Sequence, residues 1–120
     1  MKQFTSKTQK IGAIGETIAA TYLKKQGFEI LEQNVSNKFG ELDLVAKKQG
    51  TVHFFEVKAG YAGSWFNPAE NFTPAKIRKV AVSAEHYALV HHIKDYRISG
   101  VSVLIDRATN EAVAVEILAL

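Results

Sequence analysis

The chain of 120 residues contains no cysteine. This absence excludes disulfide bonds and thiolate metal sites, and it is compatible with a reducing compartment. No apolar run approaches the ~20 residues that cross a bilayer. The first residues, MKQFTSKTQK, also lack the apolar core of a secretory signal. We therefore expect a soluble, cytoplasmic protein with no membrane association.

The chain also lacks a strong charge imbalance, and its apolar content is not unusually low. Its formal net charge is +3, and hydrophobic residues make up 47% of it. An ordinary apolar fraction predicts a folded protein, and this length suits one compact domain. We expect a single domain over residues 1–120, in which residues 1–9 form a flexible basic arm. The charge alone favours a polyanionic partner only slightly.

The spacing of apolar residues predicts helices and strands in a definite order. One helix is predicted over residues 11–26, where apolar side chains recur every three or four positions before Gly27. A second helix begins at Thr73-Pro74, an N-cap followed by proline, and runs to about His91. Strands are predicted over residues 28–34, 42–46, 52–57, 96–105 and 112–118, with a loop at 59–72. The order α-β-β-β-α-β-β predicts an α/β fold with a mixed central sheet of about five strands and flanking helices.

Charged residues interrupt the two apolar runs of the central stretch FGELDLVAKKQGTVHFFEVK. If these runs form a hairpin, Asp43 at the start of the first strand lies near Glu56 at the end of the second. Lys58 follows on the same face as Glu56, and alternation places Glu41 and Val45 on the same face as Asp43. Ordinary solvent-facing charges are the alternative. An acid and a lysine that close so apolar a run are costly unless they face a cleft.

Such a cluster suits a hard divalent cation. Mg²⁺ prefers oxygen ligands and retains several waters, and Mn²⁺ fits equally. Asp43, Glu56 and the backbone carbonyl of Val57 would leave positions open for water and a phosphodiester oxygen. The metal would activate the water, and Lys58 would orient it or stabilise the developing charge. Glu16, at the edge of the apolar stripe of the first helix, could reach the metal through a water, cap the helix or face solvent.

Basic and aromatic residues follow the charged cluster along the chain. Lys76, Arg78 and Lys79 crowd the first turns of the second helix, where the helix dipole disfavours cations. Phosphate contact and a plain solvated face both explain them. Trp65, in the aromatic loop 61–72, could stack on a base or pack onto the domain as a small satellite core.

Taken in order, Asp43 and then Glu56-Val57-Lys58 resemble the signature of the PD-(D/E)xK nuclease superfamily, which has the restriction-endonuclease-like fold. The chain more specifically resembles the YraN-like family of proposed endonucleases, related to archaeal Holliday-junction resolvases. The matching segments are GAIGETIAATYLKKQGFEILEQN, GELDLVA, HFFEVK and TPAKIRKV, within about residues 12–105.

The resemblance implies roles for particular residues. Glu16 matches the helix glutamate of the family, Asp43 and Glu56 match its metal-binding acids, and Lys58 matches its catalytic lysine. Lys76 matches a basic position that contacts a backbone phosphate. The resemblance also implies a branched or otherwise structured DNA substrate and a homodimer.

The leading hypothesis is a metal-dependent endonuclease that hydrolyses phosphodiester bonds in DNA. A non-catalytic nucleic-acid-binding protein of the same fold is one alternative. The acidic pair argues against it, because carboxylates repel the DNA backbone unless a cation lies between them. An interaction module that uses loop 61–72 is the other alternative, and it predicts neither metal affinity nor salt-dependent DNA binding.

Overall fold

The computed structural model describes residues 7–120. Its elements are α1 (Lys7–Lys25), β1 (Glu29–Asn37), β2 (Gly40–Lys48), β3 (Thr51–Tyr61), α2 (Pro68–Asn71), α3 (Pro74–Val90), β4 (Tyr96–Ile105) and β5 (Ala112–Ala119). The predicted order is confirmed, with the short helix α2 added before α3. The flexible arm predicted at residues 1–9 is wrong for residues 7–9, which begin α1. The rest of that arm lies outside the described residues.

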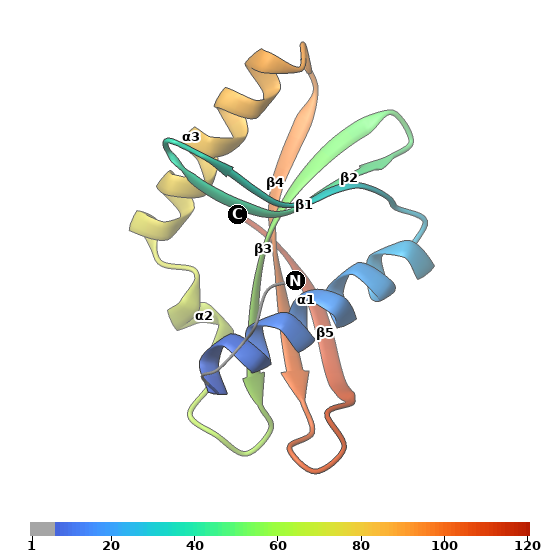
Figure 1. Ribbon diagram of the computed structural model, residues 1–120, viewed down its shortest axis with the longest axis vertical. Helices are drawn as coiled ribbons and strands as arrows, with labels where there is room; N and C mark the ends of the chain where they lie inside the picture. The colour runs from blue at the N-terminus through green and yellow to red at the C-terminus, as the bar shows by residue number, and fades with distance from the viewer. Residues whose placement is uncertain (1–6) are drawn as a thin grey trace.

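The strands form one mixed sheet in the order β1-β2-β3-β4-β5 (Figure 1). Neighbouring strands are antiparallel except β3 and β4, which pair in parallel from Val52 opposite Tyr96 to Tyr61 opposite Ile105. A parallel pair needs a long crossover, and α3 lies within it. The predicted mixed sheet of about five strands with flanking helices is therefore confirmed.

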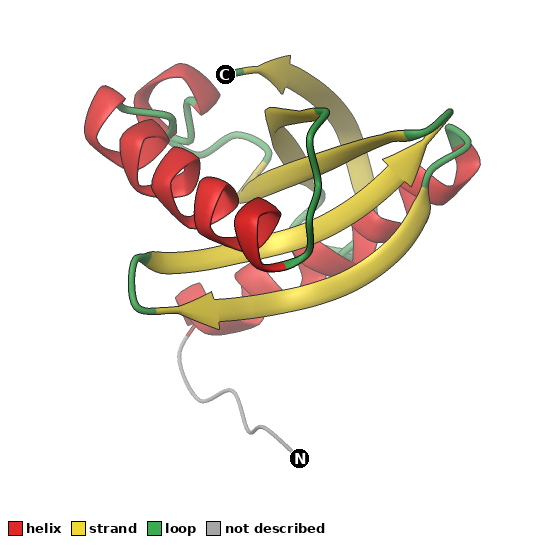
Figure 2. Cartoon of the chain, turned by 90° about the horizontal axis from the view of Figure 1, so that it is seen from above, coloured by secondary structure: helices red, strands yellow, loops and turns green. Residues whose placement is uncertain are grey.

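The central strand β3 is buried on both faces of the sheet. Two adjacent residues of β3, Phe54 and Phe55, are both fully buried. They belong to different core clusters because adjacent side chains of a strand point to opposite faces. Phe55 packs with α1 residues such as Leu23, and Phe54 packs with α3 residues such as Val80 and Tyr87. Figure 2 shows the two helices on opposite sides of the sheet. Burial on both faces explains why two adjacent residues of this strand, Phe54 and Phe55, are both large and apolar.

Strand β3 is longer than the sequence predicts. Residues 59–61, assigned to a loop by their composition, pair with residues 103–105 of β4. The tertiary neighbour therefore extends the strand through Gly60, which local propensity disfavours. The predicted loop 59–72 is reduced to residues 62–67 followed by α2. None of the helices in residues 7–120 is long and apolar enough to span a membrane.

Strand β2 departs from regular alternation near Asp43. Leu42 and Val45, three residues apart, pack in the same core cluster against α3. Strict alternation would place them on opposite faces. The prediction that Glu41, Asp43 and Val45 share one regular face is therefore wrong, and Asp43 lies at an irregular point of the strand.

Candidate active site

The site lies where β2 and β3 separate. Their paired register ends with Leu44 opposite Phe55, and β3 continues beyond this pair. Two residues further on, the backbone N–H of Val57 donates to Oδ2 of Asp43 at 2.7 Å. A side-chain oxygen thus bonds β3 where the strand ladder has stopped. This bond fixes the Asp43 carboxylate beside β3, as the predicted hairpin requires.

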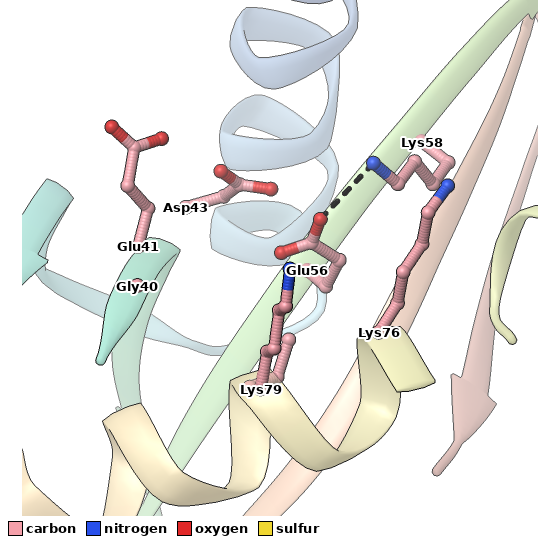
Figure 3. Close-up of a pocket in the computed structure, with 8 residues that line it drawn as sticks. Gly40, Glu41, Asp43, Glu56, Lys58, Lys76 and Lys79 are labelled. Carbon is pink, nitrogen blue, oxygen red and sulfur yellow. Dashed lines mark ion pairs between the residues drawn. The ribbon is translucent and has the colours of Figure 1, made fainter. Parts of the chain in front are cut away.

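A pocket of about 250 Å³ opens at this separation. Strands β2 and β3 and helix α3 all contribute to its wall. In Figure 3, the carboxylates of Asp43 and Glu56 lie in the middle of the group, with Glu41 to one side and the lysines of α3 rising from below. The lining residues are Gly40, Glu41, Asp43, Glu56, Lys58, Lys76, Lys79 and Val80.

Glu56 and Lys58 form an ion pair within this pocket. The Nζ of Lys58 lies 3.2 Å from Oε1 of Glu56, and the two side chains are 28% and 17% exposed, respectively. Both residues are on the face of β3 that also carries Phe54, as alternation along the strand predicts. The ammonium group is therefore held beside the carboxylates, in a partly desolvated position where charge interactions are stronger than in bulk water.

The carboxyl group of Asp43 is strongly perturbed. Burial raises the pKa of Asp43 to about 7, and the negative charges of Glu56 and, to a smaller extent, Glu16 act in the same direction. The hydrogen bond from Val57 and the charge of Lys58 lower the pKa, but they do not offset the burial. Like charges crowded in a partly buried pocket raise a carboxyl pKa, and functional sites are where such arrangements concentrate.

Glu16 approaches this cluster from α1, and the close approach depends on Gly15. A Cβ atom at Gly15 would collide with the Cβ of Ala59 in β3, so only glycine allows this helix–strand distance. Glu16 is consequently close enough for its charge to raise the pKa of Asp43. Sequence reasoning missed Gly15 as a positioning residue. The signal that could have found it is the run of small residues in GAIGETIAA.

Asp43 and Glu56 are the pair of acids in the pocket that could contribute to a metal site. No group of three His, Cys, Asp or Glu side chains within the described chain is close enough to hold a metal ion by itself. The Asp43–Glu56 pair, with the predicted carbonyl ligand of Val57, leaves several positions to water, as Mg²⁺ prefers. A cation bound beside Asp43 would offset the negative charges that help to raise its pKa.

The predicted nucleic-acid contacts separate into two groups. Lys76 and Lys79 line the pocket. They lie in the first turns of α3, where the Thr73 hydroxyl caps the helix by accepting the N–H of Lys76 at 3.3 Å, as predicted. Arg78 is exposed on the same helix and does not line the pocket. Trp65 is 100% exposed, so the expectation that it packs as a satellite core is wrong.

The fold and the site together define an α/β protein with a carboxylate–lysine pocket at a split between strands. The chain belongs to the uncharacterised protein family UPF0102, which it matches over residues 15–107. This assignment confirms the YraN-like resemblance.

Individual relatives are similar over most of their length. The chain is 42% identical to the UPF0102 protein of Helicobacter hepaticus over 82 residues, which are 68% of this chain and 72% of the relative. It is 38% identical to the UPF0102 protein of Corynebacterium efficiens over 102 residues, covering 84% and 83% of the two chains.

Solved structures show a weaker likeness. A chain in the EndoMS-dsDNA2 complex matches with a TM-score of 0.44 and 12% identity. The match covers 88% of this chain and 38% of that one, so this chain spans well under half of it. An fdxN element excision controlling factor from Anabaena variabilis matches with a TM-score of 0.47 and 14% identity, over 86% and 98% of the two chains.

Proposed function

We propose that the protein is a divalent-metal-dependent endonuclease that hydrolyses phosphodiester bonds in DNA. The observation that carries the proposal is the pocket in which Asp43 and Glu56 lie beside Lys58, opposite Lys76 and Lys79 of α3. Carboxylates alone would repel a phosphate, whereas carboxylates with a cation and a wall of lysines attract one. The same pocket therefore has groups for a metal and groups for the DNA backbone.

Each residue in the pocket has a role under this proposal. Asp43 and Glu56, with the carbonyl of Val57, would hold Mg²⁺ or Mn²⁺. When bound, the metal would supply an activated water and neutralise charge on the phosphate. Lys58, held by Glu56, is placed to stabilise the charge that develops on the phosphate oxygens. Glu16 would reach the metal through a water.

The basic residues of α3 would bind the DNA backbone. Lys76 and Lys79 face the pocket, and Arg78 would contact a phosphate outside it. Backbone contacts position DNA without selecting its sequence. We extend the proposal to branched or otherwise structured DNA and to a homodimer, which rest on the resemblance to the resolvases alone.

The direct test is cleavage of four-way-junction, flap, duplex and single-stranded DNA with Mg²⁺ and with Mn²⁺. We expect the wild type to cleave at least one of them and Glu56→Ala to abolish cleavage. Glu41→Ala is the matched control, because Glu41 lines the same pocket but is exposed. It should keep most of the activity. Retained DNA binding without any cleavage would contradict the proposal and favour a non-catalytic binding protein.

Metal binding has a readout that does not depend on activity. A ligand that binds only the folded state stabilises it by about 2.7 kcal/mol at a hundred times its dissociation constant. We expect Mn²⁺ to raise the melting temperature of the wild type and to leave that of Glu56→Ala almost unchanged. An equal shift in both proteins would place the metal somewhere else.

A further inference from the structure

Trp65 is the single tryptophan of the chain, and its side chain is 100% exposed. Tryptophan is highly buried on average, because it is the largest apolar side chain. Internal packing therefore does not account for this residue.

The turn that carries Trp65 is ordered by hydrogen bonds on both sides of it. The Ser64 hydroxyl donates to the carbonyl of Tyr61 at 2.6 Å, and the Ser64 N–H donates to the same carbonyl at 3.2 Å. The Phe66 N–H donates to the Ser64 hydroxyl at 3.3 Å. Gly63, with a φ of 81°, supplies the left-handed conformation that the turn needs. The indole is thus presented outward from a fixed turn.

Phe66 attaches this turn to the face of the sheet that carries the pocket. A Cβ atom at Gly60 would collide with the ring of Phe66, so the ring lies directly on the backbone of β3. Gly60 follows Lys58 by two residues and therefore lies on the same face, about 7 Å further along the strand. The turn with Trp65 is consequently fixed just beyond Lys58, which lines the pocket.

We infer that Trp65 is a stacking platform for an unpaired base of the DNA substrate. The substrate would then carry single-stranded nucleotides next to the phosphate that is cleaved. This inference rests on the proposed endonuclease function, which places the cleaved phosphate between Lys58 and the lysines of α3. Lys58 and Gly60, the residue on which Phe66 anchors the turn, lie about 7 Å apart along β3, a length similar to two base steps of a stacked strand. The base that reaches Trp65 would therefore belong to a nucleotide beyond the phosphate bound in the pocket.

The chemistry of the indole favours single-stranded DNA over duplex. Stacking requires the flat face of a base, and a single strand exposes these faces to aromatic side chains. A duplex presents only the edges of its bases in the grooves. The nearby lysines supply backbone contacts that either kind of DNA can use. Trp65 is therefore the residue that would distinguish single-stranded DNA from duplex DNA.

Intrinsic fluorescence tests this inference, because excitation at wavelengths that tyrosine does not absorb isolates the signal of the single tryptophan. Asp43→Asn protein, which should bind without cleaving, is titrated with a single-stranded oligonucleotide and with a blunt duplex of the same length. Binding is followed in parallel by the anisotropy of labelled DNA. We expect the single strand to quench the fluorescence along its binding curve and the duplex to leave it nearly unchanged. Single-strand binding without quenching, equal quenching by both DNAs, or no binding of either would overturn the inference.

Affinity measurements on wild-type and variant proteins give a second test. Stacking on one base is worth about 1–3 kcal/mol, which corresponds to roughly a 5- to 150-fold change in affinity. Trp65→Ala should weaken single-strand binding by about tenfold or more and duplex binding by less than about twofold. Trp65→Phe should keep most of the affinity. Leu89→Ala is the matched control, because Leu89 is another large apolar side chain that is 71% exposed, at the C-terminal end of α3 and away from the pocket lysines. Equal losses on both DNAs would overturn the inference.

The inference and the proposed function can fail separately. Glu56-dependent cleavage that is unchanged in Trp65→Ala on every substrate would refute stacking and leave the endonuclease in place. Quenching by single strands without cleavage of any DNA would support the stacking platform and refute the endonuclease.

Discussion

At the scale of single residues, the folded environment of Asp43 disfavours the negative charge of its carboxylate. Burial and two neighbouring carboxylates disfavour the ionised form, and its pKa is raised to about 7. A folded protein gains nothing in stability from such a carboxylate near neutral pH. The proposed metal site gives the arrangement a purpose, since functional groups often lower the stability of the fold that holds them.

Removing the charge of Asp43 should therefore stabilise the metal-free protein. Between about pH 4 and pH 7 the folded state binds more protons at Asp43 than the unfolded state does, so stability falls as pH rises through this window. We expect Asp43→Asn to raise the free energy of unfolding by about 1–3 kcal/mol at pH 8, while its amide oxygen still accepts the N–H of Val57. Urea unfolding in EDTA at pH 8 and pH 4 measures this difference.

The gain in the free energy of unfolding from Asp43→Asn should shrink towards zero at about pH 4, where the wild-type carboxyl of Asp43 is protonated in the folded state. Glu41→Gln, at an exposed acid of the same pocket, is the control and should change stability little at either pH. A gain of the same size at both pH values would mean that the effect does not come from the charge of Asp43.

The residues of the pocket differ in how well the sequence predicts them. Glu56 and Lys58 share a face of β3 as alternation predicts, and the predicted hairpin brings the strand of Asp43 beside them. The hydrogen bond from Val57 depends on an irregularity of β2 that a two-residue period cannot reveal. The exposure of Trp65 depends on a turn whose anchor, Phe66, packs on a glycine of β3.

At the scale of elements, the same distinction between local and tertiary causes appears. The cap of α3 is local, and Thr73-Pro74 predicts it correctly. The length of β3 is tertiary, because residues 59–61 are strand only through their pairing with β4. The distance between α1 and the sheet also depends on tertiary packing, because Ala59 of β3 leaves no room for a Cβ atom at Gly15.

Two glycines of α1 give a matched test of that packing. A Cβ at Gly15 would collide with Ala59, whereas a Cβ at Gly12 would meet no atom within 4 Å. Gly15→Ala should destabilise the fold by about 1–3 kcal/mol through overpacking. Gly12→Ala should stabilise it by up to about 1 kcal/mol through helix propensity. Thermal and urea unfolding of both variants measure the contrast.

The same pair tests whether α1 places Glu16. If Gly15→Ala lifts the helix, cleavage should fall further than stability explains, at a temperature where the variant is fully folded. Gly12→Ala should cleave like the wild type. If both variants were stabilised, the close approach of α1 to β3 would be disproved.

At the scale of the whole molecule, the formal charge of +3 is too small to attract DNA by itself. Attraction must come from where the charges lie, and the lysines of α3 face the carboxylates across one pocket. A salt titration separates local contacts from overall charge, because each phosphate contact to a duplex adds about −0.9 to the slope of log affinity against log salt. This slope therefore counts the lysines that touch the backbone.

Lys76→Ala should weaken DNA binding and make the salt slope shallower by about one contact. Lys94→Ala is the control, because it removes the same charge from an exposed position beyond the other end of α3. It should leave the slope unchanged. Anisotropy titrations of one duplex at several salt concentrations compare the variants, and Lys79→Ala should behave like Lys76→Ala. If Lys94→Ala changed the slope as much as Lys76→Ala, binding would depend on net charge, and the lysines of the pocket would lose their assigned role.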